Sequence, residues 1–170
     1  MTPLRGLAFD AYGTLFDVYS IGQQAEQLFP ESGTQISLLW RQKQVEYSQL
    51  SALSDPSPGG SRHYRPFREL TEAALRYSLQ RLGLPLTDGQ VQTLMGAYDH
   101  LEAYPECMGV LEHLKSLGLP MAILSNGSPD MLDAAVTSSG LAPLLDHVIS
   151  VDEVRQFKTH PACYDMAQPR

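Results

Sequence analysis

Three short apolar segments, each followed by polar residues, limit how this chain can fold. They lie at residues 4–10, 120–124 and 147–151, and patterns typical of helices fill the intervals between them. Strands that alternate with helices favour a parallel sheet with helices on its faces, which is the α/β class. The first interval holds about a hundred residues, far more than a crossover between neighbouring strands requires. We therefore expect a helical domain inserted after the first strand.

The expected domain limits follow from this uneven spacing. We predict an α/β core made of residues 1–15 and 102–170, and a helical cap made of residues 16–101. Apolar periodicity, with proline and glycine at the ends, predicts seven helices. They cover residues 21–29, 34–53, 67–82, 87–104, 105–117 and 128–140, and the last begins at Pro161. The first strand, at residues 4–10, is expected to be fully buried.

Apolar spacing also predicts which faces of two helices are buried. For the helix at residues 34–53, we expect the buried stripe to be Ile36, Leu39, Trp40, Tyr47 and Leu50. For the helix that follows Pro105, we expect the buried face to be Cys107, Val110, Leu111, Leu114 and Leu117.

The polar residues that follow the three strands predict a site. Because the carboxyl ends of parallel strands meet at one edge of a sheet, these side chains should share a crevice. They are Asp10, Tyr12 and Thr14 after the first strand, Ser125 and Asn126 after the second, and Lys158 after the third. A carboxylate held rigidly at a strand end suits a nucleophile. Simpler alternatives are that Asp10, Ser125 and Asn126 only cap turns or helices, and that Lys158 lies on the surface.

Composition excludes several classes of protein. The net charge of -7, with 12 basic and 19 acidic residues, argues against a nucleic-acid partner. No apolar run is long enough to cross a bilayer, and a strand begins too soon after Met1 for a signal peptide. Two cysteines, Cys107 and Cys163, are too few for a disulfide framework or a zinc site. We expect a cytoplasmic protein that has no membrane partner.

Several strings in the expected order resemble the haloacid dehalogenase superfamily. They are Asp10 with Thr14 after the first strand, Ser125-Asn126-Gly127 after the second, and Lys158 followed by Pro161 and Tyr164. Most of that superfamily are magnesium-dependent phosphatases, which carry a second aspartate two residues after the nucleophile as a general acid. Here that position is Tyr12. With the string Leu-Trp-Arg-Gln-Lys-Gln-Val-Glu-Tyr at residues 39–47, the chain resembles the L-2-haloacid dehalogenase branch instead.

The resemblance implies hydrolysis of short L-2-haloacids to D-2-hydroxy acids. Asp10 would displace the halide and form an ester, which water then cleaves. Such a displacement needs no proton donor for the leaving group, but it needs an anion-stabilising pocket. The substrate would be a small 2-haloalkanoate, no metal or other cofactor would be required, and the protein would be a homodimer.

The resemblance also implies a role for each residue of the site. Arg41 would reach from the cap to the departing halide, assisted by Asn126, and Ser125 would hold the substrate carboxylate. Lys158 would keep Asp10 ionised and Thr14 would orient it. Tyr12 and Tyr164 would line the site. Without the resemblance, Arg41 reads as an ordinary exposed helix residue and Tyr164 as part of the core.

The resemblance predicts further strands and a fourth motif after the Lys158 region, whereas the sequence ends at residues 167–170. The apolar run alone predicts a fully buried first strand, but without the flanking strands that the resemblance predicts we expect it to be an exposed apolar edge of the sheet. We also expect low activity, with Asp10 becoming alkylated while hydrolysis of the ester stalls. The competing functions are a phosphatase of the same superfamily and an inactive remnant that serves as an interaction module.

Overall fold

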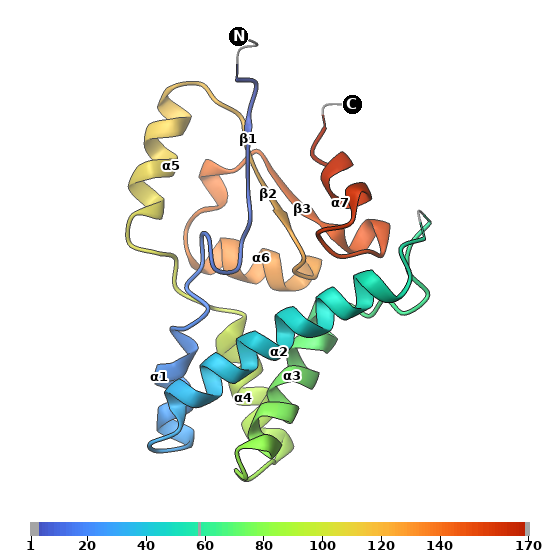
Figure 1. The fold of residues 1–170 in the computed structure, drawn as a ribbon. Coiled ribbons are helices and arrows are strands. Elements are labelled where there is room, and N and C mark those ends of the chain that lie inside the picture. The colour runs from blue at the N-terminus through green and yellow to red at the C-terminus, as the bar shows by residue number, and fades with distance from the viewer. Residues whose placement is uncertain (1–3, 58, 169–170) are drawn as a thin grey trace.

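The computed structural model describes residues 4–57 and 59–168, and it contains a parallel three-stranded sheet (Figure 1). The strands are β1 (Leu7–Phe9), β2 (Met121–Ser125) and β3 (His147–Ser150), in the spatial order β1-β2-β3. The predicted α/β class with a parallel sheet is confirmed.

The register aligns the carboxyl ends of the strands. Phe9 pairs with Ile123, and Ser125 pairs with Ser150, so all three strands end at the same edge. The prediction of a fully buried first strand is wrong, because Ala8 is exposed and its neighbours in β1 are half-buried. The physical reason is that in the described residues β1 pairs with β2 alone, whereas β2 lies between two strands.

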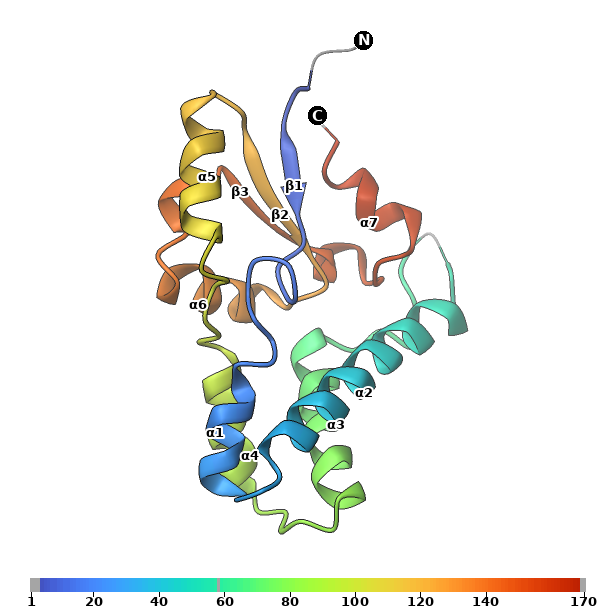
Figure 2. The same cartoon turned by 60° about the vertical axis from the view of Figure 1, so that its left-hand side comes forward.

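The core helices surround the sheet. They are α5 (Cys107–Ser116), α6 (Pro129–Ser138) and α7 (Pro161–Asp165), with 3-10 turns at Ala142–Leu144 and Val151–Val154. Figure 2 shows α5 and α7 on opposite sides of the sheet. The predicted buried face of α5 is too broad. Cys107 and Leu111 are buried, but Val110 and Leu117 are 49% and 60% exposed, so α5 contacts the core only along a narrow stripe.

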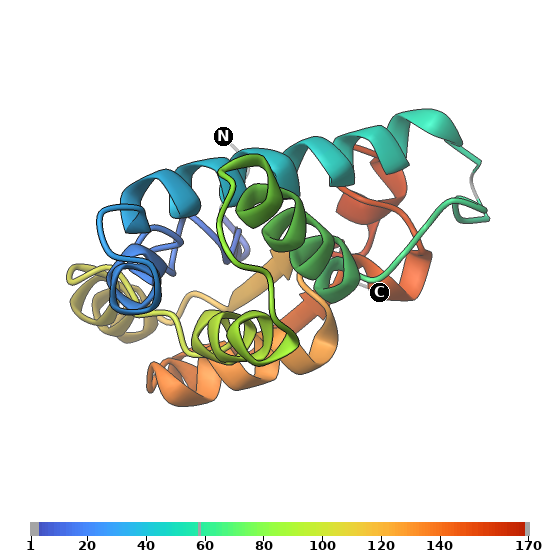
Figure 3. The ribbon, with the colours of Figure 1, turned by 90° about the horizontal axis from the view of Figure 1, so that it is seen from below.

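The helices between β1 and α5 pack on one another as a separate layer. They are α1 (Ile21–Leu28), α2 (Gly33–Ser54), α3 (Phe67–Arg81) and α4 (Asp88–Tyr98), and Figure 3 shows α2 running along the length of this layer. The prediction that the fourth helix continues to about residue 104 is wrong. The chain leaves α4 after Tyr98 because it returns to the core in extended form. There the Asp17 amide donates to Glu102 O at 2.8 Å, and the Tyr104 amide donates to Leu15 O at 3.0 Å. We keep residues 16–101 as the proposed limits of the cap.

The buried face of α2 is more polar than predicted. Ile36 and Trp40 are buried as expected, but Leu50 is 56% exposed. The buried positions beyond Trp40 are small or polar: Gln44, Ser48 and Ser51. Serine fits a close helix contact because its hydroxyl can donate to its own helix, as Ser48 Oγ does to Val45 O at 2.8 Å. The prediction from apolar spacing was therefore wrong at Leu50, whereas Tyr47 is half-buried and packs against the core.

The cap also contacts the core through side chains. Arg68 on α3 forms ion pairs with Asp99 after α4 and with Asp130 on α6. Its amide donates to Ser128 Oγ at 3.0 Å. No helix in the described part of the chain is long and apolar enough to cross a membrane.

Candidate active site

Asp10 stands directly after β1, at the carboxyl edge of the sheet. Its Oδ1 accepts a hydrogen bond from the Ala11 amide at 2.8 Å and another from Lys158 Nζ at 2.9 Å. Gly13, with φ of +92°, allows the tight turn that follows, and the Leu15 amide closes that turn onto Ala11 O at 2.9 Å. The carboxylate is 42% exposed, so a rigid turn presents an accessible anion.

Lys158 is fixed from two directions. Its ammonium, 16% exposed, donates to Leu124 O at 2.8 Å as well as to Asp10. Its backbone amide donates to Asn126 Oδ1 at 2.9 Å. Because both contacts tie the Lys158 segment to the end of β2, the ammonium is held against Asp10. The side-chain oxygen of Asn126 thus helps to hold the Lys158 backbone in place.

Ser125 and Gly127 form the turn at the end of β2. Ser125 is 1% exposed, and its Oγ accepts the Gly127 amide at 3.1 Å. Gly127 packs so closely on Tyr12 that an added Cβ would lie 2.7 Å from Tyr12 Cε2. This turn therefore sits against the nucleophile turn with no space between them.

Arg41 reaches from α2 in the cap to the nucleophile turn. Its Nη2 donates to Tyr12 O at 2.8 Å, and its Nη1 donates to Gln44 Oε1 at 2.8 Å. The same Nη2 lies 3.5 Å from the place where a Cβ on Gly13 would stand. The cap thus places a permanent cation beside the turn that carries Asp10.

Tyr12 lies at the junction of cap and core. Its ring centroid is 5.6 Å from that of Tyr98 and 5.8 Å from that of Phe67, and the residue is 3% exposed. Burial raises the pKa of its hydroxyl, and the nearby Tyr98 raises it further, so the group stays neutral. Within the described residues this buried hydroxyl has no hydrogen-bond partner. The position two residues after Asp10 is therefore neutral and largely apolar.

Two predicted site residues, Thr14 and Tyr164, are exposed, and in the described part of the chain no hydrogen bond joins their side chains to the rest of the site. Thr14 is exposed, and it contributes its amide, which donates to Ala11 O at 3.2 Å. Tyr164 lies on α7 and is 50% exposed. In the described structure no hydrogen bond or ring contact joins Tyr164 to Asp10. The roles of both residues stay predictions.

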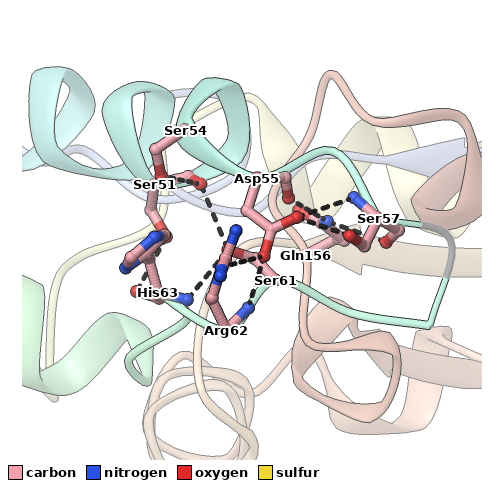
Figure 4. A network of polar contacts seen from close by, with 8 residues as sticks. All are labelled: Ser51, Ser54, Asp55, Ser57, Ser61, Arg62, His63 and Gln156. Atoms are coloured by element: carbon pink, nitrogen blue, oxygen red, sulfur yellow. Dashed lines mark hydrogen bonds and ion pairs between the residues drawn. The ribbon is translucent and has the colours of Figure 1, made fainter.

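A loop of the cap supports the segment that carries Lys158, which the sequence pattern did not predict. Gln156, fully buried, donates from Nε2 to Asp55 O at 2.9 Å and to Ser57 O at 3.1 Å (Figure 4). The Asp55 carboxylate accepts the Ser57 hydroxyl and the Arg62 amide, and these bonds lower its pKa to about 2. A lone glutamine in a loop gives no periodic signal, so only the three-dimensional structure identifies this contact.

Among residues 4–57 and 59–168, no group of three or more His, Cys, Asp or Glu side chains is arranged to hold a metal ion. Among the described residues, the polar groups at the sheet edge include the Asp10 carboxylate, the Lys158 ammonium, the Arg41 guanidinium, and the side chains of the Ser125-Asn126 turn. This set can bind an anion beside a carboxylate nucleophile.

Comparison with known proteins agrees with this arrangement. The family model for haloacid dehalogenase-like hydrolases matches residues 4–167. The (S)-2-haloacid dehalogenase H-109 of Pseudomonas putida is 42% identical over 168 residues, which are 99% of this chain and 72% of the relative. Among solved structures, the L-2-haloacid dehalogenase RSc1362 superposes with a TM-score of 0.92 at 51% identity, covering 98% of this chain and 72% of that one. The Xanthobacter autotrophicus L-2-haloacid dehalogenase with chloropropionic acid covalently bound superposes with a TM-score of 0.87 at 42% identity, covering 96% and 63%.

Proposed function

This chain belongs to the haloacid dehalogenase-like hydrolase family, and we propose that it hydrolyses short L-2-haloacids to D-2-hydroxy acids. One observation carries the proposal: Asp10 stands at the end of β1 with Lys158 Nζ at 2.9 Å, and the neutral Tyr12 follows two residues later. A second carboxylate at that position would repel both the halide and the substrate carboxylate. The relatives named above are 2-haloacid dehalogenases, and the structure that holds chloropropionic acid covalently fits an ester mechanism.

In the first half-reaction a carboxylate oxygen of Asp10 attacks the α-carbon of the substrate. The carbon–oxygen bond forms as the carbon–halogen bond breaks, the halide leaves with the electron pair, and the α-carbon inverts. Both hydrogen bonds described for Asp10 are to Oδ1, so we assign the attack to Oδ2. Lys158 Nζ, 2.9 Å from Oδ1, pairs with the carboxylate and holds it in orientation.

Other polar residues of the site bind the negatively charged groups of the substrate. Arg41, with Asn126, stabilises the departing halide, and Ser125 binds the substrate carboxylate. Thr14 belongs to the turn that orients Asp10, and Tyr12 and Tyr164 line the site. In the second half-reaction water attacks the ester carbonyl of Asp10, and the bond between that carbonyl carbon and the ester oxygen breaks. One proton of the water ends on the hydroxyl of the departing hydroxy acid, the other is released to solvent, and the carboxylate is regenerated.

The proposal is tested by measuring chloride release from L- and D-2-chloropropionate, with Asp10→Asn as the inactive control. We expect at least one equivalent of chloride per protein from the L enantiomer and none from the D enantiomer. No chloride from either enantiomer would refute the proposal. Magnesium-dependent release of phosphate from p-nitrophenyl phosphate, absent in Asp10→Asn, would replace it with the phosphatase alternative.

We also propose that the protein is a cytoplasmic homodimer. Leu38, Leu50 and Leu53 are 53%, 56% and 76% exposed, and helical geometry places them within one third of the circumference of α2. Such a stripe suits a second copy of the chain. Leu53→Glu is expected to give monomers in analytical ultracentrifugation, whereas the control Gln92→Glu, at an exposed position on α4, stays dimeric. The free, buried thiols of Cys107 and Cys163 fit a reducing compartment, which cell fractionation would test.

A further inference from the structure

Gln44 is a fully buried polar residue to which the mechanism above gives no part. It lies on α2 three positions after Arg41, so the two side chains share one face of the helix. A buried amide is costly unless its donors and acceptors are satisfied. The partners of Gln44 therefore indicate why a glutamine stands there.

Its carbonyl oxygen faces two donors. Oε1 accepts Arg41 Nη1 at 2.8 Å and the Tyr98 hydroxyl at 3.1 Å. Arg41 has a second partner, Tyr12 O, which its Nη2 contacts at 2.8 Å. Two oxygens thus fix the plane of the guanidinium, one from the cap and one from the nucleophile turn.

Thr71 fixes the direction of the Gln44 amide. Its hydroxyl, fully buried, donates to Phe67 O at 2.7 Å, so its oxygen is left to accept Gln44 Nε2 at 2.8 Å. Since Nε2 must face Thr71, Oε1 must face Arg41. The backbone oxygen of Thr71 accepts Trp40 Nε1 at 2.8 Å, which ties α2 to α3 at the same level. The amide therefore has one orientation.

Both oxygens that hold Arg41 are uncharged. A carboxylate partner would orient the guanidinium equally well, but it would cancel most of the field that an arriving anion experiences. A carbonyl acceptor orients the group and leaves its net charge in place. A glutamine at this buried position therefore orients the Arg41 guanidinium and leaves its positive charge available to bind an anion.

We propose that Gln44 is the positioning residue of the site, which aims the Arg41 guanidinium at the leaving halide and keeps its positive charge available. The proposal rests on the proposed function and names the group that gives Arg41 its geometry. Thr71 and Tyr98 act through Gln44, as the outer part of the same network.

The decisive variant is Gln44→Glu, measured by bromide binding. The chain contains a single tryptophan, Trp40, whose ring centroid lies 5.0 Å from that of Tyr98, and the Tyr98 hydroxyl donates to Gln44, so Trp40 fluorescence is used to follow binding. The introduced carboxylate should pair with Arg41 and weaken bromide binding roughly tenfold or more at pH 8. When the pH is lowered the introduced carboxyl becomes protonated and neutral, so the ratio of variant to wild-type Kd should fall towards one. A merely structural role of Gln44 predicts no such pH dependence.

Two further variants control this experiment. Gln49→Glu makes the same charge change on the exposed face of α2, and its Kd ratio should stay near one at every pH. Thr71→Val keeps the shape but removes the acceptor for Gln44 Nε2, so it should weaken bromide binding at every pH. It also serves as the test if Gln44→Glu does not fold.

The outcomes separate this proposal from the proposed function. If wild-type protein neither binds bromide nor is alkylated by L-2-chloropropionate, both proposals fail. If wild-type protein is alkylated but Gln44→Glu binds bromide like Gln49→Glu, or if Thr71→Val binds it like wild type, Gln44 does not position Arg41 and only this proposal fails.

Discussion

The contact between Gly127 and Tyr12 makes a sharp prediction about how the two turns of the site fit together. In Gly127→Ala the new Cβ would stand 2.7 Å from Tyr12 Cε2 and 2.9 Å from Leu132 Cδ2. Tyr12 is 3% exposed and Leu132 is fully buried, so neither side chain can withdraw into solvent. Real Cβ atoms do not approach other atoms this closely, so either the ring or the turn must move.

The expected cost is that of overpacking a close-packed interior, about 1–3 kcal/mol in the free energy of unfolding. Urea denaturation followed by Trp40 fluorescence measures it directly, as a fall in midpoint at an unchanged slope. Because the displaced ring belongs to the residue whose carbonyl oxygen accepts Arg41 Nη2, bromide binding should weaken as well.

Gly96→Ala is the matched control. Gly96 lies inside α4, and a Cβ added there would meet nothing within 4 Å. The same substitution should stabilise the protein by roughly 0.8–1 kcal/mol, because alanine favours the helix. Equal effects at the two positions would refute the claim that the nucleophile turn and the Ser125-Asn126-Gly127 turn are tightly packed.

Three other substitutions test separate contacts. Lys158→Met removes the partner of Asp10, and it should slow alkylation by L-2-chloropropionate roughly ten- to a hundredfold, as followed by intact-mass spectrometry; an unchanged rate would exclude the assigned role. Tyr12→Phe deletes a buried hydroxyl that has no described partner, so the free energy of unfolding should rise by about 1 kcal/mol rather than fall. The pKa of Asp55, about 2 in the folded protein, lies below its ordinary value of 3.8. Its stabilising contribution is therefore present above pH ~4 and lost as the pH falls towards 2. Thermal melting should show a smaller loss over this range in Asp55→Asn, and identical profiles would contradict the assignment.

Features of the fold that leave a periodic or local signal in the sequence, such as strand ends and helix ends, could be predicted. Strand ends mark Asp10 and Ser125, and parallel connection brings them to one edge whatever the details of packing. Lys158 lies in the loop after β3, and its contacts with Leu124 O and Asn126 Oδ1 hold it at that edge. Helix ends at glycine were also predictable, as at Gly83 and Gly118, whose φ angles are +68° and +73°.

The partners of individual side chains could not be predicted in this way. Leu50 satisfies the helical period but faces outward, whereas Gln44 breaks the apolar pattern and is fully buried. The difference depends on which helix packs against α2 and how closely, which is a tertiary property. The same reason applies to Gln156, whose contact with the Asp55 loop joins residues far apart in the chain.

The identity of the attacking group is the central claim, and a single turnover in water enriched in a heavy oxygen isotope tests it most directly. With protein in excess over L-2-chloropropionate, the products are analysed by intact mass and by mapping of the peptide that carries Asp10. Attack by Asp10 predicts either an ester on that residue or, once water has cleaved it, the heavy isotope in the Asp10 carboxylate and ordinary oxygen in the hydroxyl of the product. Heavy isotope in the product hydroxyl after one turnover, with Asp10 unlabelled and unmodified, would show that water attacks the substrate directly and would contradict the mechanism.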